Sequence, residues 1–326
     1  MAVYTEVSDE DIATFLGHYD VGTLVSMKGI AEGVQNSNYL LGTEKEDGSA
    51  QQFILTLYEA GTNSQELPFF LSLMDHLATK KLPCPVPIKD KNGNALQNLN
   101  GRPAAMVSFL QGVSVRTPQP HHCEELGAAL ADLHLAAADF SMTRTNDLSL
   151  DGWIDLADDQ LPRADRVRPD LPDIIRDELA HLKAAWPTLN ALPRGIVHAD
   201  LFPDNVFFKG QNLSGLIDFY FAATDILVYD IGVCLNAWCF EADGSFNVTK
   251  AGRLLAGYLS HRTLSDAELA ALPLLARGAA MRFLLTRLHD WFATHDGALV
   301  RKKDPLEYLR KLRFHQAVTG PADYGL

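Results

Sequence analysis

Three oxygen-bearing side chains follow one another over a short span of the chain, and their types suit the transfer of a phosphoryl group. Asp200 and Asn205 lie in the segment HADLFPDN, and Asp218 follows in the segment LIDFY. Apolar runs flank both segments, so we expect short strands that bring the three side chains together. Phosphoryl transfer needs a carboxylate to accept or orient the proton of the attacking hydroxyl. It also needs oxygen ligands for the magnesium ions that bridge the phosphates of ATP.

The spacing His-x-Asp, with Asn five residues after the Asp, matches the catalytic-loop pattern of kinases. Asp218-Phe219 stands where that pattern continues with the metal-binding D-F-G, although Tyr220 replaces its glycine. Ala199 replaces an arginine that serves phosphorylated activation loops, which argues against a regulated protein kinase. Taken singly, a His-x-Asp could be a turn and an aspartate could cap a strand end. Their joint order and spacing favour a kinase.

The elements around these residues divide into a strand-rich first part and a helical second part. Apolar and β-branched runs predict the strands, while capping residues, prolines and leucines at helical spacing predict the helices. In the first part we expect strands over 23–30, 37–42, 52–58 and 102–110, and helices from Ser8–Asp11 onward and over 64–80. In the second part we expect helices over 121–138, around 175–186 and over 283–292, with strands and turns in 195–221.

Composition restricts the class of protein. The chain has 326 residues, of which 47% are hydrophobic, and a formal charge of −13, which suits a two-lobed globular protein and not a surface that follows nucleic-acid phosphates. Its four cysteines form no C-x-x-C pair, and we expect them to be reduced. The acidic N-terminus does not match a signal peptide, and there is no run of about eighteen apolar residues. We therefore expect a cytoplasmic protein without nucleic-acid or membrane partners; the sequence gives no signal of oligomeric state.

Several segments resemble the aminoglycoside phosphotransferase-like kinases. HADLFPDN with LIDFYFA is similar to that family's H-x-D-x-x-x-x-N and I-D-F/W segments, and GAALADLH to its G-x-x-L-A-x-L-H helix. FILTLYE, ELPFFLSLMDHLA and MRFLLTRLHDW are similar to the homoserine kinases of this superfamily. The resemblance implies an α+β, bilobal protein-kinase-like fold with a strand-rich nucleotide-binding lobe (1–106), a hinge (107–113) and a mainly helical lobe with the catalytic site (114–326). It implies ATP-dependent phosphorylation of the hydroxyl of L-homoserine.

The resemblance also implies roles for the residues of the loop. By position in the motif, Asp200 would be the catalytic base, and Asn205 and Asp218 would be the ligands of Mg²⁺. His198 would support the loop by hydrogen bonding rather than take part in the reaction. Asp230, in the segment YDIG, would buttress the loop, although a helix N-cap is an equally good interpretation of this residue.

A nucleotide site is expected in the first part of the chain. The segment GIAEGVQNS (29–37) stands between two strands, where backbone N–H groups near Gly33 and the side chains of Gln35, Asn36 and Ser37 could approach phosphates. The segment is not G-x-G-x-x-G, and on its own an ordinary hairpin turn would be the default interpretation.

The strand over 52–58 carries a departure from the kinase pattern. Ile54 would face the adenine, and Thr56 stands where kinases have a lysine that contacts the phosphates. Either another cation such as Lys28 or the magnesium ions would supply the missing charge. The resemblance places the adenine on the backbone of the segment that contains Ser108, Phe109 and Leu110.

An amino-acid substrate would need partners for its carboxylate and its ammonium group. Arg282 and Arg287 are candidates for the carboxylate, although both could be exposed helix cations. Trp238 could form a pocket wall or pack in the core. Possible ammonium partners are Glu32, Asp204, Asp225 and Glu241. One alternative function is a kinase for another small alcohol (choline, methylthioribose, hydroxylysine or an aminoglycoside). A second is a nucleotide-binding pseudokinase, which remains an alternative because Thr56 replaces the lysine of active kinases.

Overall fold

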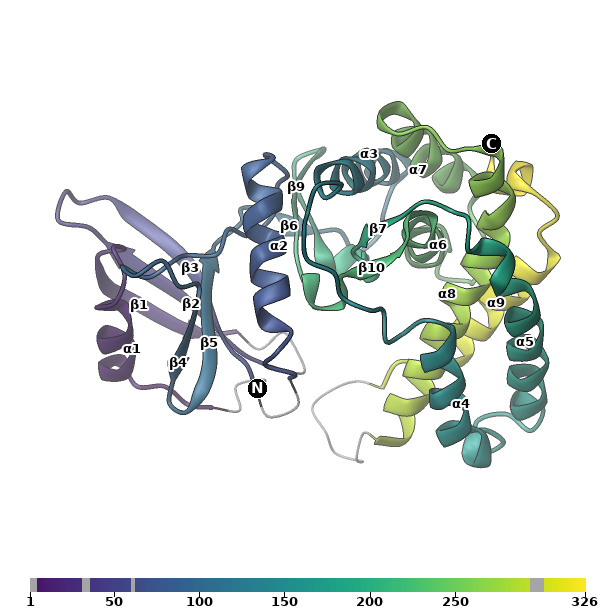
Figure 1. The fold of residues 1–326 in the computed structure, drawn as a ribbon, viewed down its shortest axis with the longest axis horizontal. Coiled ribbons are helices and arrows are strands. Elements are labelled where there is room, and N and C mark those ends of the chain that lie inside the picture. Colours follow the sequence, from purple (N-terminus) through teal and green to yellow (C-terminus); the bar gives the residue numbers. More distant parts are fainter. Residues whose placement is uncertain (1–4, 31–35, 60–61, 294–301) are drawn as a thin grey trace. The chain divides into compact units, whose positions relative to one another are not determined.

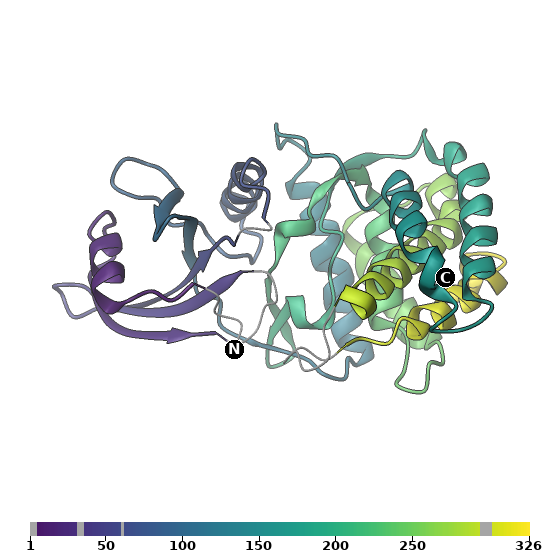
Figure 2. The ribbon, with the colours of Figure 1, turned by 90° about the horizontal axis from the view of Figure 1, so that it is seen from below.

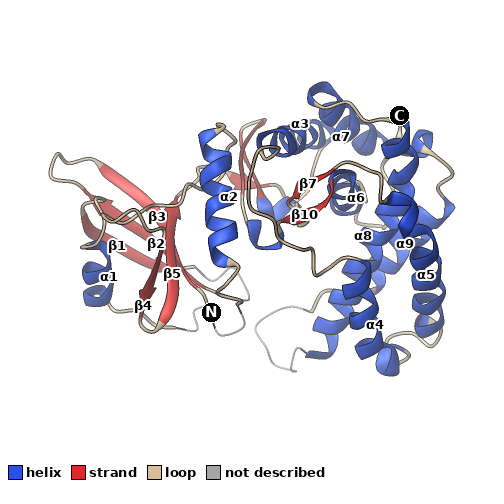
Figure 3. Cartoon of the chain, in the orientation of Figure 1, coloured by secondary structure: helices blue, strands red, loops and turns tan. Residues whose placement is uncertain are grey.

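Two units make up the chain, Met1–Gln111 and Gly112–Leu326. The computed structural model describes residues 5–30, 36–59, 62–293 and 302–326. The boundary between the units falls inside the segment 107–113 that we expected as a hinge, and a hinge motion there stays a prediction. Strands dominate the first unit and helices the second (Figure 3).

The first unit is built on one antiparallel sheet with the strand order β1-β2-β3-β5-β4. The four strands expected from the sequence are confirmed as β1, β2, β3 and β5, and β4 was not expected. The elements are α1 (Asp9–Leu16), β1 (Thr23–Gly29), β2 (Ser37–Glu44), β3 (Ala50–Leu57), α2 (Leu67–Thr79), β4 (Leu96–Leu99) and β5 (Arg102–Ser108). Figure 1 shows α1 beside the strands of this sheet.

One face of this sheet forms the core of the first unit, and α1 covers it. A capping box between Ser8 and Asp11 starts this helix, as its sequence predicts. Ile12 and Phe15 of α1 pack in one buried cluster with Leu41 of β2 and Leu55 of β3. Because side chains alternate along a strand, the residues between these positions lie on the opposite face of the sheet.

The second unit combines helices with two small antiparallel sheets, β7 with β10 and β6 with β8 and β9. The three expected helices and the strand-rich segment between the last two of them are confirmed. The strands are β6 (Val113–Ser114), β7 (Arg194–Val197), β8 (Val206–Lys209), β9 (Asn212–Leu216) and β10 (Ala223–Ile226). The helices are α3 (Pro120–Ala136), α4 (Leu150–Ala164), α5 (Leu171–Ala185), α6 (Leu227–Trp238), α7 (Val248–His261), α8 (Asp266–Ala293) and α9 (Leu306–Ala317). Short 3₁₀ turns span Trp186–Leu189, Pro203–Asn205, Phe219–Phe221 and Pro321–Tyr324.

Helix α8 is the central helix of the second unit and packs against α4, α6 and α9 (Figure 2). Its length and composition would allow it to cross a membrane, but 67% of its most apolar window is buried inside the protein. Helices α3 and α7 also pack closely. A Cβ atom on Gly127 would lie 2.0 Å from the carbonyl oxygen of Leu254, so this position requires glycine. The four cysteines are buried and unpaired, as expected.

Candidate active site

Two residues of the motif segments, one after β7 and one after β9, have unusual backbone conformations. Ala199 has φ of 62° and Asp218 has φ of 65°, both in the left-handed region. A residue with a Cβ atom in this region is strained by about 1–2 kcal/mol relative to the ordinary helical conformation. Such strain persists only where surrounding contacts fix the backbone, and it is frequent at catalytic sites.

Buried side chains hold the strained loop from both sides. The carboxylate of Asp230 accepts hydrogen bonds from the backbone N–H of His198 at 2.7 Å and from that of Ala199 at 2.7 Å. On the other side, the guanidinium of Arg282 donates to the carbonyl oxygen of Ala199. Asp230 lies in the first turn of α6 and is 1% exposed. The alternative interpretation of Asp230 as a helix N-cap does not fit, because Ile226 occupies the N-cap position of α6.

The side chain of Asp200 is fixed by its neighbours in the loop. The Nδ2 group of Asn205 donates to the carbonyl oxygen of Asp200 at 2.8 Å and to its carboxylate at 3.2 Å. Burial raises the pKa of Asp200 to about 6, the charge of Arg282 opposes this rise, and the charges of Asp218 and Asp204 add to it. The carboxylate is therefore ionised at neutral pH and poised to accept a proton.

His198 links the two motif segments and does not point to solvent. Its Nδ1 accepts the backbone N–H of Asp200 at 3.3 Å, so its Nε2 carries the proton and donates to the carbonyl oxygen of Ile217 at 3.0 Å. Burial lowers the pKa of His198 to about 4, so the ring is neutral at pH 7. This geometry fits a supporting role better than direct participation.

The oxygen groups of the loop fit a magnesium ion that ATP would bring. Asp204 and Asp218 lie close enough to Asp200 for their charges to raise its pKa, so a cation among these groups would relieve mutual repulsion. Within the described residues, no group of three His, Cys, Asp or Glu side chains could hold a metal unaided. Magnesium usually binds one or two carboxylates and completes its shell with phosphate oxygens and water. Asn205 and Asp218 would therefore be enough protein ligands for a magnesium ion that also binds the phosphates of ATP and water.

The sequence matches one family over most of its length. The phosphotransferase enzyme family matches residues 26–264. The chain belongs to this family. Two full-length relatives are a homoserine kinase from Xanthobacter autotrophicus, 60% identical, and one from Rhizobium johnstonii, 56% identical; each match covers 100% of this chain and 99% of the relative.

Solved structures of other phosphotransferases share the fold. An amicoumacin kinase superposes with a TM-score of 0.69 at 16% identity, over 95% of this chain and 94% of that one. A choline kinase from Cryptosporidium parvum gives 0.66 at 15% identity, over 95% of each chain. These likenesses establish the bilobal kinase-like architecture that the sequence motifs implied.

The residues expected to bind substrate in this phosphotransferase have protein partners. Arg282 is 1% exposed, and its Nη2 lies 3.9 Å from a carboxylate oxygen of Asp200. Arg287 forms an ion pair with Glu307 at 2.6 Å. Neither arginine is an exposed helix cation. Trp238 is 1% exposed and donates from Nε1 to the carbonyl oxygen of Leu201 at 2.7 Å, which is the core-packing arrangement.

The residues expected as possible ammonium partners differ in their surroundings. Asp225 pairs with Arg194 at 2.9 Å, and Glu241 pairs with Lys250 at 2.7 Å. Asp204 is exposed in the catalytic loop itself. Glu32 lies outside the described residues.

In the first unit, the expected phosphate loop is only partly described. Gly33 and Gln35 lie outside the described residues. Asn36 accepts hydrogen bonds from the backbone N–H of Glu59 at 3.1 Å and from the Thr62 hydroxyl at 2.9 Å. Ser37 is fully buried and donates to Glu59 at 2.7 Å. Both side chains thus stabilise the unit itself, and their contact with a nucleotide stays a prediction.

The sheet face opposite α1 carries the residues expected to contact ATP. Thr56 donates from its hydroxyl to Asn38 Oδ1 at 2.7 Å. Lys28 lies opposite Leu40 in the β1–β2 register, and Leu40 lies opposite Ile54 in the β2–β3 register. Residues directly opposite each other in antiparallel strands share a face, so the exposed Lys28 is on the face of Ile54.

The segment expected to hold the adenine begins at the end of β5. The N–H of Ser108 donates to the carbonyl oxygen of Val86 at 2.9 Å, and that of Phe109 to Gln52 at 3.2 Å. These two N–H groups already have protein partners, and the contact of this segment with adenine stays a prediction.

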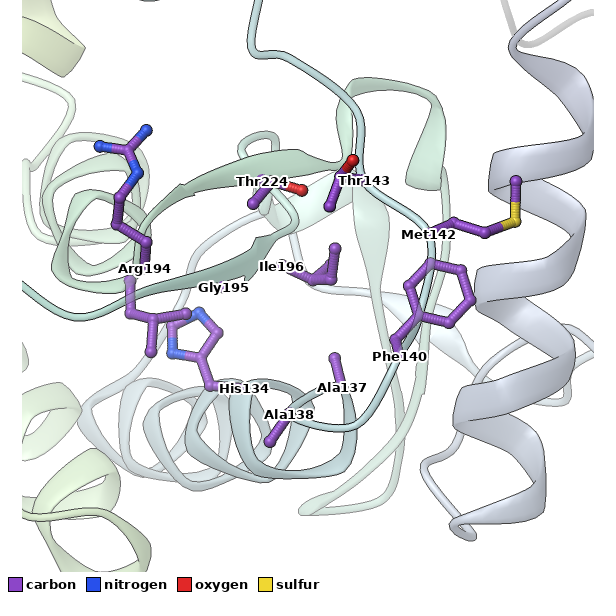
Figure 4. A pocket seen from close by; sticks show the side chains of 11 residues that line it. His134, Ala137, Ala138, Phe140, Met142, Thr143, Arg194, Gly195, Ile196 and Thr224 are labelled. Carbon is purple, nitrogen blue, oxygen red and sulfur yellow. The ribbon is translucent and has the colours of Figure 1, made fainter.

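A cavity of about 180 Å³ in the second unit lies apart from the catalytic side chains. Its lining includes His134, Phe140 and Ile196 (Figure 4), but not Asp200 or Asp218. His134 was not singled out from the sequence, although it ends the GAALADLH motif. Its Nε2 lies 3.2 Å from the carboxylate of Asp230, so it belongs to the support of the loop.

Proposed function

We propose that this phosphotransferase transfers the γ-phosphoryl group of ATP to the hydroxyl of L-homoserine and forms O-phospho-L-homoserine, a step of threonine biosynthesis. The observation that carries the proposal is identity of 56–60% to proteins named homoserine kinase over the full length of both chains. The fixed carboxylate of Asp200 supplies a base of the kind this reaction needs. We further propose that the protein acts in the cytoplasm without nucleic-acid or membrane partners.

The loop residues divide the work of the reaction. Asp200 takes the proton of the substrate hydroxyl as the new O–P bond forms and the bond from the γ-phosphorus to ADP, the leaving group, breaks. Asn205 holds the Asp200 carboxylate in place through its amide N–H, while Asp230 and Arg282 fix the peptide of Ala199 next to it. These contacts hold the carboxylate of Asp200 and the adjacent peptide in one geometry, which is the kind of preorganisation that catalysis by positioning needs.

Asn205 and Asp218 would hold magnesium, which neutralises charge on the phosphates of ATP when it is bound. In the first unit, Ile54 would contact the adenine. Lys28 would supply the positive charge for the phosphates that kinases have at the position of Thr56. The carbonyls of the segment at Ser108 and Phe109 and the N–H of Leu110 would hydrogen-bond the adenine.

A substrate panel tests this proposal. The protein would be incubated with ATP, Mg²⁺ and, separately, L-homoserine, choline, methylthioribose, hydroxylysine and an aminoglycoside, with ADP release as the readout. We expect the highest kcat/KM for L-homoserine and a phosphomonoester product by ³¹P NMR. Preference for another alcohol would replace the substrate assignment. ATP binding without turnover of any alcohol would support the pseudokinase instead.

A further inference from the structure

An amino-acid substrate that presents its hydroxyl to Asp200 needs a cation for its carboxylate, and several cations near the loop are already paired. Arg282 donates to the Ala199 carbonyl oxygen and faces Asp200. Arg287 and Lys311 both bind the same carboxylate, that of Glu307, at 2.6 and 2.7 Å. These three cations are largely buried, and a substrate carboxylate could recruit them only by breaking their contacts with protein oxygens.

Lys303 differs from these three cations. It is exposed, and within the described ranges of the chain it forms no ion pair. Its Nζ lies 5.8 Å from the ring centroid of Phe202, which follows Asp200 by two residues in the catalytic loop. In keeping with this position, the positive charge of Lys303 lowers the pKa of Asp200.

Both Lys303 and Phe202 have fixed surroundings. The ring of Phe202 packs edge-on against Phe283 of α8, with centroids 4.9 Å apart. Directly after Lys303, the carboxylate of Asp304 accepts the backbone N–H of Leu306, the first residue of α9, at 2.9 Å. The lysine therefore extends from an anchored backbone, and its ammonium is left for a ligand.

We propose that Lys303 binds the carboxylate of the substrate and makes the site selective for amino alcohols that carry a carboxylate over those that do not. The inference rests on the proposed function and deepens it. In homoserine, three carbon–carbon bonds separate the hydroxyl carbon from the carboxylate, a span that a lysine beside the catalytic loop can match. A lysine acts here as a compact point charge on a flexible stem, so no bidentate geometry is needed.

The chain offers a matched control in the preceding residue. Lys302 has the same side chain, but its Nζ lies 5.9 Å from the ring of Trp291 in α8 and not against the catalytic loop. Substitution of either lysine by methionine removes one charge and keeps an unbranched side chain that is only one atom shorter. Only the substitution of Lys303 should alter the recognition of a substrate carboxylate.

The experiment compares L-homoserine with 3-aminopropan-1-ol, which is homoserine without its carboxylate. For Lys303→Met we expect kcat/KM for homoserine to fall about tenfold or more through KM, as expected for loss of a hydrogen bond to a charged group, with the value for 3-aminopropan-1-ol unchanged. Lys303→Arg should recover part of the loss, and Lys302→Met should match the wild type. Calorimetric binding of homoserine to the three variants provides a readout that does not depend on turnover of the analogue.

The outcomes separate this inference from the proposed function. An equal loss for both substrates in Lys303→Met would overturn the inference, because Lys303 would then act on the phosphates or the fold. Unchanged homoserine affinity in Lys303→Met would overturn it as well. If the wild type does not phosphorylate homoserine at all, the proposed function fails instead.

Discussion

The catalytic loop of the second unit and the sheet face opposite α1 in the first unit position their polar groups by different means. In the loop, Asp230, Arg282 and Asn205 hold the backbone and the base through short hydrogen bonds, several of them buried. On the sheet face, Thr56 donates to Asn38 within the sheet, and Lys28 is exposed. The loop thus fixes the position of the catalytic base, whereas the sheet face provides the charge of Lys28 on a flexible side chain. Changes in the loop should therefore act on kcat, and changes on the sheet face should act on the KM for ATP.

The largest effect is expected for Asp218→Ala. Removal of this carboxylate takes away a proposed magnesium ligand at a position that is exposed, so the fold should persist. We expect kcat at saturating ATP and Mg²⁺ to fall about 10³-fold or more, since the metal neutralises charge that develops in the transition state. Activity within tenfold of the wild type, with an unchanged dependence on Mg²⁺, would remove Asp218 from the metal site.

A smaller effect on kcat is expected for Asp230→Asn. An amide can accept only one of the two N–H groups of His198 and Ala199 with its oxygen, so the loop should shift. A displacement of about 1 Å near the reacting atoms lowers the rate about 100-fold. Glu178→Gln is the matched control, because Glu178 is also a buried carboxylate of the second unit but pairs with Arg277. It should lower the melting temperature without lowering kcat; an equal fall in kcat would contradict the positioning role of Asp230.

On the sheet face, Lys28→Met should raise the KM for ATP about tenfold, equivalent to about 1.4 kcal/mol, and leave kcat nearly unchanged. Lys45→Met removes a lysine from the turn after β2 and should leave both constants unchanged. Steady-state kinetics with varied ATP measure the difference. If Lys28→Met matches Lys45→Met, magnesium supplies the charge that Thr56 lacks.

The rigidity of the loop should also appear in the dependence of stability on pH. Burial lowers the pKa of His198 to about 4 in the folded protein, below the value of about 6.5 in an unfolded chain. The unfolded state therefore binds the proton more readily, and stability is lost as pH falls from about 6.5 towards 4. Between pH 7 and pH 5 we expect the wild type to lose about 2 kcal/mol more than His198→Asn in the free energy of unfolding. Equal losses in urea titrations would show that this ring is not held neutral by burial.

The sequence indicated the loop and two residues that contact it, His198 and Asp230, but not the contact of Arg282, for a physical reason. Asp200, Asn205 and Asp218 lie within one short segment, so their spacing alone brings them near one another. Arg282 reaches the loop from α8, and its partner is a backbone carbonyl, which leaves no trace in sequence spacing. The sequence therefore indicated an arginine of interest but not its contact.

The missed elements have similar causes. Helix α6 is buried on nearly all sides, so it lacks the alternation of polar and apolar residues that marks a surface helix. Strand β4 is short, and its pairing with β5 depends on tertiary contacts. Lys303 gave one local signal, the basic pair it forms with Lys302 before α9, but only the structure separates a lysine beside the catalytic loop from its neighbour.

The most direct test of the central claim is the kcat of Asp200→Asn for homoserine phosphorylation, measured together with the Kd for ATP. Asparagine keeps the size of the side chain and removes its ability to accept a proton. We expect kcat to fall about 10²–10⁴-fold with an ATP affinity close to that of the wild type. A near-normal kcat with intact ATP binding would contradict the assignment of Asp200 as the base.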